Sequence, residues 1–189
     1  MPSGRDPARV GGVAGRVRVF IACSLDGFIA GSEDDLSWLP EPDPAEDYGF
    51  ASFMAETAAI LMGRGTFDVV TGFPEWPYGE TPVYVATSRP LEAPVKTVKA
   101  VTGTPAKMMA AVRRKAKDGD VYLDGGALIR SFLDAGLVDE LVVTLVPVIL
   151  GHGTPLFAGV SNRPRLVPRE TRTFPSGLTQ LRYSVVAEQ

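Results

Sequence analysis

The sequence contains very few residues of two reactive types, because its 189 residues include one cysteine and one histidine. Cys23 alone can form no internal disulfide and cannot support a two-cysteine or zinc–cysteine mechanism, so we expect no metal site. A single cysteine also suits a reducing compartment, and we expect a cytoplasmic protein. His152 has a glycine on each side, which favours an exposed loop residue over a catalytic acid.

Long hydrophobic runs and basic clusters are missing as well. The longest apolar stretch, 141–150, is interrupted by Thr144 and Pro147 and is far shorter than the ~20 residues of a membrane span. Lysine and arginine form no basic block, and the formal net charge is −3. We therefore expect neither a membrane nor a nucleic acid as a partner, and we expect a small-molecule substrate instead.

The composition that is present predicts one compact domain. The length is close to the prior of about 150 residues per domain, and 45% hydrophobic with 22% charged residues is typical of a protein with a buried core. Residues 1–15 are rich in glycine, proline and arginine and lack the apolar segment of a secretory signal. We predict a flexible N-terminal tail over 1–15 and one domain over 16–189.

Short apolar strands alternate with helical patterns, which is typical of an α/β fold. We predict a single domain with a mixed, mostly parallel central sheet flanked by helices and closed by a C-terminal antiparallel hairpin. A long loop is expected over 28–44. The expected strands are 17–24, 59–62, 83–87, 95–101, 121–124, 141–149, 165–173 and 178–186, and the expected helices start near Asp47, Thr66, Pro105 and Gly126.

Hydrophobic spacing and capping residues define these helices. Phe50, Phe53, Met54 and Thr57 lie at i, i+3, i+4 and i+7, which predicts one buried face for the first helix. Thr104 followed by a proline predicts the start of the third helix.

Two strand-to-helix junctions carry glycines. Residues 121–130 run from a strand through Gly125 and Gly126 into a helix, and a second junction places Arg64 between Gly63 and Gly65. Bare backbone at a helix start lets a phosphate approach amide groups aimed by the helix dipole. Ligands of open sheets bind beyond the carboxyl ends of strands. The two junctions therefore predict a phosphorylated cofactor.

Four segments, in this order and spacing, resemble the dihydrofolate reductase-like superfamily, and most closely the branch that contains the reductase domain of bacterial riboflavin biosynthesis. The segments are Ser-Leu-Asp-Gly-Phe-Ile-Ala at 24–30, Met-Gly-Arg-Gly-Thr-Phe at 62–67, Asp-Gly-Gly at 124–126, and Val-Pro-Val-Ile-Leu-Gly at 146–151 followed by Pro-Leu-Phe at 155–157. The resemblance covers 17–186. It implies an NADPH-dependent reductase, and a homodimer, since relatives in this branch are often dimers.

The resemblance also implies which residues hold NADPH. Arg64 and Thr66 are expected at the cofactor phosphates, and Ala22 is expected at the nicotinamide. A hydroxyl at Ser88 and a guanidinium at Arg89 suit a 2′-phosphate, because arginine binds phosphate oxygens in pairs. The complete expected cofactor set is Ala22, Gly63, Arg64, Thr66, Ser88, Arg89, Asp124, Gly125, Gly126, Ala127 and Leu128.

Hydride transfer needs a positioned nicotinamide and no protein nucleophile. Residues 26–38, called the lid below, are expected to close over it. The proton donor stays open: Asp43, Glu46 and Asp47 compete for a carboxylate position near the first helix, and Asp26 in the lid is the alternative. The expected substrate-binding residues are Trp38, Phe50, Met54, Thr144 and Pro147.

Three classes of function follow from these expectations. The first is an NADPH-dependent reductase of a heterocyclic substrate, such as 5-amino-6-(5-phosphoribosylamino)uracil or a pterin. The second is a reductase of the same fold that acts on an unrelated carbonyl or imine. The third is a nucleotide-binding protein without turnover.

Overall fold

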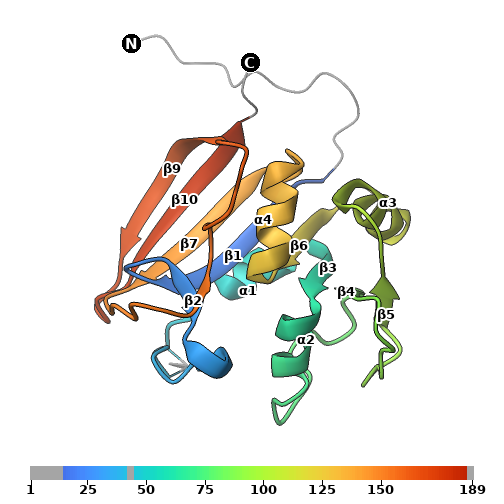
Figure 1. Cartoon of the computed structure of the whole chain (residues 1–189), viewed down its shortest axis with the longest axis horizontal. Helices are drawn as coiled ribbons and strands as arrows, with labels where there is room; N and C mark the ends of the chain where they lie inside the picture. The colour runs from blue at the N-terminus through green and yellow to red at the C-terminus, as the bar shows by residue number, and fades with distance from the viewer. Residues whose placement is uncertain (1–14, 42–44, 187–189) are drawn as a thin grey trace.

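The computed structural model describes residues 15–41 and 45–186, and it is built on one twisted eight-stranded sheet (Figure 1). The strand order is β5-β4-β3-β6-β1-β7-β10-β9, in which the first six strands are parallel, β10 is antiparallel to β7, and β9 is antiparallel to β10. The predicted fold class is confirmed. The predicted tail lies outside the described residues except for Gly15. The strands are β1 (Val17–Ser24), β3 (Thr57–Gly63), β4 (Val83–Ala86), β5 (Val98–Val101), β6 (Asp120–Asp124), β7 (Glu140–Val146), β9 (Arg165–Thr173) and β10 (Thr179–Val186).

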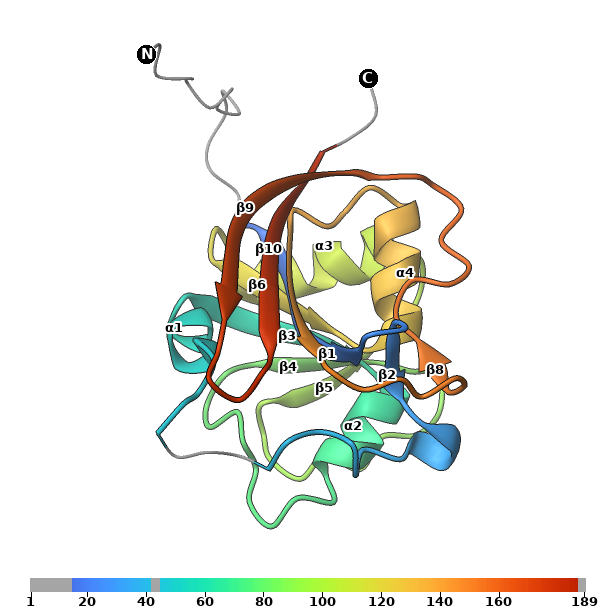
Figure 2. The same ribbon diagram turned by 90° about the vertical axis from the view of Figure 1, so that its left-hand side faces the viewer.

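Helices cover both faces of this sheet, and in Figure 2 α3 and α4 lie on one side of it while α1 and α2 lie on the other. Odd-numbered residues of β1, such as Val19, pack with α3 and α4 around Leu123 and Phe132. The opposite face packs Ile60 and Met62 against α1 and α2. The helices are α1 (Phe50–Ala55), α2 (Arg64–Val70), α3 (Pro105–Ala116) and α4 (Gly126–Asp134).

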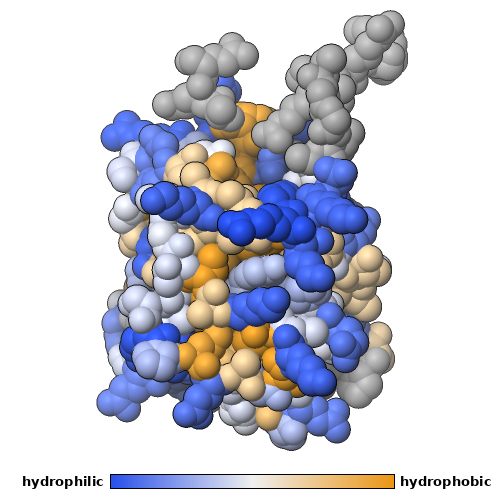
Figure 3. Space-filling model, turned by 90° about the vertical axis from the view of Figure 1, so that its right-hand side faces the viewer, coloured by the Kyte–Doolittle hydropathy of each residue, from blue (hydrophilic) through white to orange (hydrophobic). Residues whose placement is uncertain are grey.

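The outer face of α3 is charged, whereas its inner face is apolar. Met108, Met109 and Val112 are buried against the sheet, and Lys107 and Arg114 are exposed. On the side of the molecule that carries α3 and β5, hydrophilic side chains cover most of the surface and hydrophobic residues show between them in a broken band (Figure 3). In the described part of the chain, no helix is both long and apolar enough to cross a membrane.

The predicted loop over 28–44 was wrong in its first part, because the chain there forms β2 (Phe28–Ala30) and a 3-10 turn, η1 (Ser32–Asp34). β2 pairs with β8 (Thr154–Pro155) in a separate two-stranded sheet, and Leu156 N donates a 2.9 Å hydrogen bond to Gly27 O. The partner segment is more than a hundred residues away in the sequence, so no local pattern indicates this pairing.

Several predicted element ends also differ from the structure. The first helix starts at Phe50 rather than Asp47, since Asp47 lies in the preceding turn, where its carboxylate accepts hydrogen bonds from Gly49 N and from Ala51 N of the helix. Thr57 opens β3 instead of extending the helix. β7 ends at Val146 because Pro147 has no N–H to donate.

The predicted starts of one helix and one strand are also displaced in the structure, and the predicted start of another helix is confirmed. α2 begins at Arg64 with Gly63 as its N-cap, so Thr66 lies in the first turn and does not cap it. β5 begins only at Val98, which closes a turn onto Val95 O. Thr104 caps α3 as predicted, since its side chain accepts a hydrogen bond from Lys107 N.

Candidate active site

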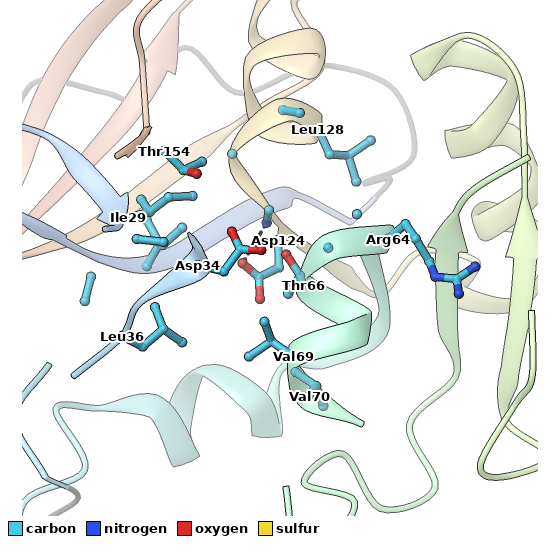
Figure 4. Close-up of a pocket in the computed structure, with 18 of the residues that line it drawn as sticks. Ile29, Asp34, Leu36, Arg64, Thr66, Val69, Val70, Asp124, Leu128 and Thr154 are labelled. Atoms are coloured by element: carbon cyan, nitrogen blue, oxygen red, sulfur yellow. Dashed lines mark hydrogen bonds between the residues drawn. The ribbon is translucent and has the colours of Figure 1, made fainter. Parts of the chain in front are cut away.

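A cavity of about 470 Å³ opens at the carboxyl edge of the parallel strands (Figure 4). Its walls come from β1, from the lid, and from the junctions β3–α2 and β6–α4. Of the expected cofactor residues, nine line this cavity: Ala22, Gly63, Arg64, Thr66, Asp124, Gly125, Gly126, Ala127 and Leu128. The structure therefore brings together both glycine junctions that the sequence singles out.

The two junctions contact each other so closely that one position must be glycine. Gly125 has a φ of +100°, and a Cβ there would lie 2.7 Å from Thr66 Oγ1 and 3.3 Å from Gly63 N. By contrast, a Cβ on Gly63 or on Gly65 would meet nothing within 4 Å. These two glycines leave room beside the backbone, whereas Gly125 makes the closest contact between the junctions.

Position 126 requires a glycine for a different reason from the one expected. A Cβ on Gly126 would lie 2.8 Å from Ile29 Cδ1, 3.0 Å from Arg130 Nη1 and 3.2 Å from Pro155 O. Protein atoms of the lid and of β8 therefore fill the direction in which we expected a diphosphate. Gly126 permits the lid to close on α4.

The start of α4 fits a diphosphate. The N-cap Gly125 makes no side-chain capping bond, and the first amide groups of a helix have no acceptor within it. The N–H groups of Gly126, Ala127 and Leu128 therefore remain available to a ligand in the cavity. Together with the open space beside Gly63 and Gly65, they form a cradle that suits the phosphates of a dinucleotide.

Two arginines lie near the outer end of this cradle, and Asp68 holds both. Arg64 Nε is 2.7 Å from Asp68 Oδ1, and its Nη1 donates a 2.9 Å hydrogen bond to Pro90 O. Arg89 Nη2 is 3.6 Å from Asp68 Oδ2. Figure 4 shows the Arg64 guanidinium turned away from the other labelled side chains. Ser88 and Arg89 are exposed at the end of β4 and, unlike Arg64, do not line the cavity.

The other end of the cavity is apolar. Ala22, near the end of β1, lines the cavity together with apolar side chains that were not among the expected site residues. Their only signal in the sequence is an apolar residue in a strand or in an otherwise polar loop. They are Phe20, Ile29, Leu36, Leu39, Phe73 and Tyr78. A small residue beneath an apolar lid leaves space for a flat ring and limits the access of water.

Asp124 is the titratable group between these two ends. Gly125 N donates a 2.7 Å hydrogen bond to its Oδ1, and the Tyr122 hydroxyl is 3.1 Å from its Oδ2. The same hydroxyl lies 3.0 Å from Phe20 O, which can only accept. One tyrosine proton cannot serve both oxygens, so both contacts are satisfied when Asp124 is protonated and donates to the tyrosine oxygen. Burial raises the pKa of Asp124 to about 6.

The expected catalytic carboxylates do not lie in the cavity. Asp26 accepts hydrogen bonds from Ser24 Oγ (2.6 Å), Leu150 N (3.1 Å) and Gly151 N (2.7 Å). The bond from the Ser24 hydroxyl is the main cause that lowers the pKa of Asp26 to about 2. Asp26 therefore stays ionised and anchors the lid to the loop after β7.

The two acids near the first helix have local partners as well. Glu46 Oε1 accepts a 2.9 Å hydrogen bond from Tyr48 N. The bonds from Ala51 N and Gly49 N hold the pKa of Asp47 below its usual range. Their geometry is that of turn and helix caps, and Asp43 lies outside the described residues.

The five expected substrate residues also lie outside the lining of the cavity. Phe50 packs in a ring cluster, with centroid distances of 5.4 Å to Phe20 and 6.3 Å to Tyr122, and Met54 packs against the same core.

The remaining three are held by other parts of the fold. Thr144 is buried, with its Oγ1 3.1 Å from Gln180 Nε2. Trp38 Nε1 donates a 3.1 Å hydrogen bond to Asp35 O, and Pro147 is exposed.

The strand order, the helices on both faces and the glycine junctions define a dihydrofolate reductase-like α/β protein. Residues 16–180 match the RibD C-terminal domain family, so the chain belongs to that family. Its structural neighbours are riboflavin biosynthesis reductases and pyrimidine reductase-like proteins.

Three known proteins show what the chain is similar to. A protein from Shewanella sp. PV-4, provisionally named a riboflavin biosynthesis protein, has 35% identity and a TM-score of 0.82, over 91% of this chain and 99% of that one. The Bacillus subtilis protein YwjB, described as uncharacterized, is 31% identical over 87% of this chain and 95% of its own length. A Thermotoga maritima deaminase and 5-amino-6-(5-phosphoribosylamino)uracil reductase shares the fold, with 18% identity and a TM-score of 0.65, over 92% of this chain and 57% of that one.

Proposed function

We propose that this protein is an NADPH-dependent reductase that reduces a C=O or C=N bond of a small molecule, with Asp124 as the proton donor. The observation that carries the proposal is the position of a protonatable buried carboxyl between a phosphate cradle and an apolar pocket, all in one cavity. Membership of the RibD C-terminal domain family supports the same reaction class.

Each part of the cavity has one task in this reaction. When bound, the reduced nicotinamide supplies the hydride. The amides of Gly126 to Leu128 hold the diphosphate, and Ala22 leaves room for a flat ring at the end of β1. Ile29 and Leu36 exclude water from the reacting atoms. Asp124 turns its proton from the Tyr122 oxygen to the substrate oxygen or nitrogen as negative charge develops there.

The protonation state of Asp124 sets an expected pH dependence. Its pKa is about 6, so the proton is present below that pH and is lost as the pH rises above it. We expect kcat to fall by about tenfold per pH unit on the alkaline side of this value. A stopped-flow or steady-state pH profile of NADPH oxidation measures it, and a flat profile between pH 5 and 8 would exclude this donor.

Two acceptor classes fit the reaction. The Thermotoga maritima relative is described as acting on 5-amino-6-(5-phosphoribosylamino)uracil, which represents the first class. Unrelated carbonyl or imine compounds form the second, and the apolar residues of the lid favour them.

The preference for NADPH over NADH is assigned to the outer end of the cradle. We expect Arg89→Ala to weaken NADPH binding by about 10- to 150-fold, or about 1.5–3 kcal/mol, because a charged hydrogen bond to the 2′-phosphate is lost. NADH binding should change little. Parallel calorimetric titrations with both cofactors at one ionic strength measure the difference.

Asp68 offers the opposite substitution as a control. Its carboxylate pairs with Arg64 and Arg89 and would face the same phosphate. We therefore expect Asp68→Asn to strengthen NADPH binding and leave NADH binding unchanged. Equal losses for both cofactors in Arg89→Ala would remove the 2′-phosphate assignment.

A homodimer is the proposed assembly, as the family resemblance implies. All nine residues of β9 are exposed along the edge of the sheet, and exposed edges of this kind favour pairing or packing with another chain. Light scattering coupled to size exclusion should give about twice the monomer mass of 20.2 kDa. A monomer at micromolar concentration would contradict the proposal.

A further inference from the structure

We propose that the substrate is an uncharged and mainly apolar carbonyl or imine compound, and that the cavity rejects phosphorylated acceptors. This inference rests on the proposed reductase function and specifies its substrate class. It follows from three features: a cavity wall with a single basic side chain, acidic and apolar side chains in the same wall, and a barrier between this cavity and a second cavity lined by arginines.

The first feature is the lack of a cation for an anionic substrate. Among the described residues that line the cavity, the one basic side chain is Arg64. Its guanidinium is bonded to Asp68 and to Pro90 O, and it points away from the apolar end (Figure 4). A phosphate at the apolar end would therefore have no cationic partner in this wall.

The second feature is the presence of acids where a phosphate would sit. Asp34 and Asp124 both line the cavity. The remaining wall on the lid side is built from Ile29, Leu36 and Leu39. An anion placed there loses its hydration without compensation and is repelled by Asp34, whereas an apolar molecule gains from the same burial.

The third feature closes the route to the arginines of a second cavity. A second cavity of about 180 Å³ is lined by Arg18, Arg172 and Arg182. Arg182 is paired with Glu140 and Arg172 with Glu170. The Phe20 ring borders both cavities and packs on the rings of α1, so a ligand cannot extend from one to the other without displacing it.

The reaction of such a substrate is balanced with the groups already named. The carbonyl carbon gains a hydride and is reduced, its oxygen takes the proton of Asp124, and the products are an alcohol and NADP⁺. Asp124 regains a proton from water. No charged group of the substrate takes part, so the cavity needs no cation for the chemistry.

Two aldehydes that differ mainly in charge test the proposal. We would compare kcat/KM for 4-methylbenzaldehyde and 4-carboxybenzaldehyde with NADPH, and include 5-amino-6-(5-phosphoribosylamino)uracil as the phosphorylated acceptor. The uncharged aldehyde is expected to exceed both anions by at least about 30-fold, since each anion is buried without a partner. Equal use of the aldehydes, or preference for either anion, would overturn the inference while leaving the reductase function in place.

A matched pair of variants locates the effect in the cavity. Leu36→Arg places a cation in the wall, and we expect it to reduce the preference for the uncharged aldehyde by about tenfold or more. Leu25→Arg makes the same change at a side chain that is 60% exposed and does not line the cavity, and it should leave the preference unchanged. An identical response of the two variants would contradict the assignment to this cavity.

Binding without turnover separates this inference from the proposed function. Ligand-observed NMR would compare 4-methylbenzyl alcohol with 4-carboxybenzyl alcohol on the protein, alone and with NADP⁺. Selective binding of the uncharged alcohol supports the inference even if no aldehyde is reduced, in which case the reductase proposal alone fails. Binding of neither alcohol, or of both equally, overturns the inference.

Discussion

Replacing Asp124 with asparagine is expected to lower kcat for hydride transfer by about 10²- to 10⁴-fold, the usual contribution of a positioned general acid. Asparagine keeps the shape of the side chain, and its carbonyl oxygen can still accept the hydrogen bond from Gly125 N. We therefore expect NADPH affinity to stay within about threefold of the wild-type value. Single-turnover kinetics together with calorimetry measure both quantities.

The pH profile and the folding stability check the same variant. Since the proton donor is absent, the alkaline fall of kcat near pH 6 should disappear. The pKa of Asp124 is raised from 3.8 to about 6 by burial, so the folded state favours the protonated form and loses stability as the pH rises through this range. Asp124→Asn should increase the free energy of unfolding at pH 8 by about 3 kcal/mol and change it little at pH 3.5. Full activity with an unchanged profile would assign the proton to another group.

Substituting valine for Gly125 should abolish cofactor binding, with at least a hundredfold loss of NADPH affinity as the approximate expectation. The backbone has a φ of +100°, which a β-branched residue rarely adopts, and the new Cβ would lie 2.7 Å from Thr66 Oγ1. The two junctions would have to separate, which moves the first amides of α4 away from the phosphates. Calorimetry with NADPH and NADH should show equal losses.

Gly136→Val is the matched control for this prediction. Gly136 also has a positive φ, +64°, but a Cβ there would meet nothing within 4 Å, and the residue follows α4 at its far end. We expect this variant to lose about 1–3 kcal/mol of stability through backbone strain and to keep its NADPH affinity. Thermal unfolding of both variants separates loss of fold from loss of the cradle. Equal affinity losses would mean that strain, and not contact between the junctions, causes the effect.

Local sequence patterns were sufficient for most of the framework. Thr104 and Pro105 specify the start of α3 through capping and a fixed φ, and the apolar strands gave the sheet. The β2–β8 pair could not be found in this way. Two segments of three and two residues carry no periodicity, and their pairing depends on a loop more than a hundred residues further along the chain.

For the site, too, the sequence predicts features that depend on neighbouring residues and misses those that depend on distant parts of the chain. The sequence indicates the glycine junctions because a glycine between a strand and a helix predicts a tight turn from neighbouring residues alone. Nine of the expected cofactor residues line the cavity. The catalytic carboxylate is harder to predict from the sequence. An acid near a helix start gives the same pattern whether it accepts a hydrogen bond from the first turn of the helix, as Asp47 does, or takes part in the reaction. The raised pKa of Asp124 comes from burial, which outweighs the lowering effect of the hydrogen bonds with Tyr122 and Gly125, and no neighbouring residue in the sequence reveals that burial.

The anchoring of the lid limits which part of it can move to open the cavity. Asp26 is bonded to Leu150 N and Gly151 N, Gly27 O accepts from Leu156 N, and β2 is paired with β8. Residues 24–30 are thus tied to the loop after β7, and opening must begin beyond Ala30. A hinge there uncovers the apolar part of the cavity, whereas β2 and β8 stay packed against the start of α4. We expect an ordered kinetic scheme in which the cofactor enters first and leaves last.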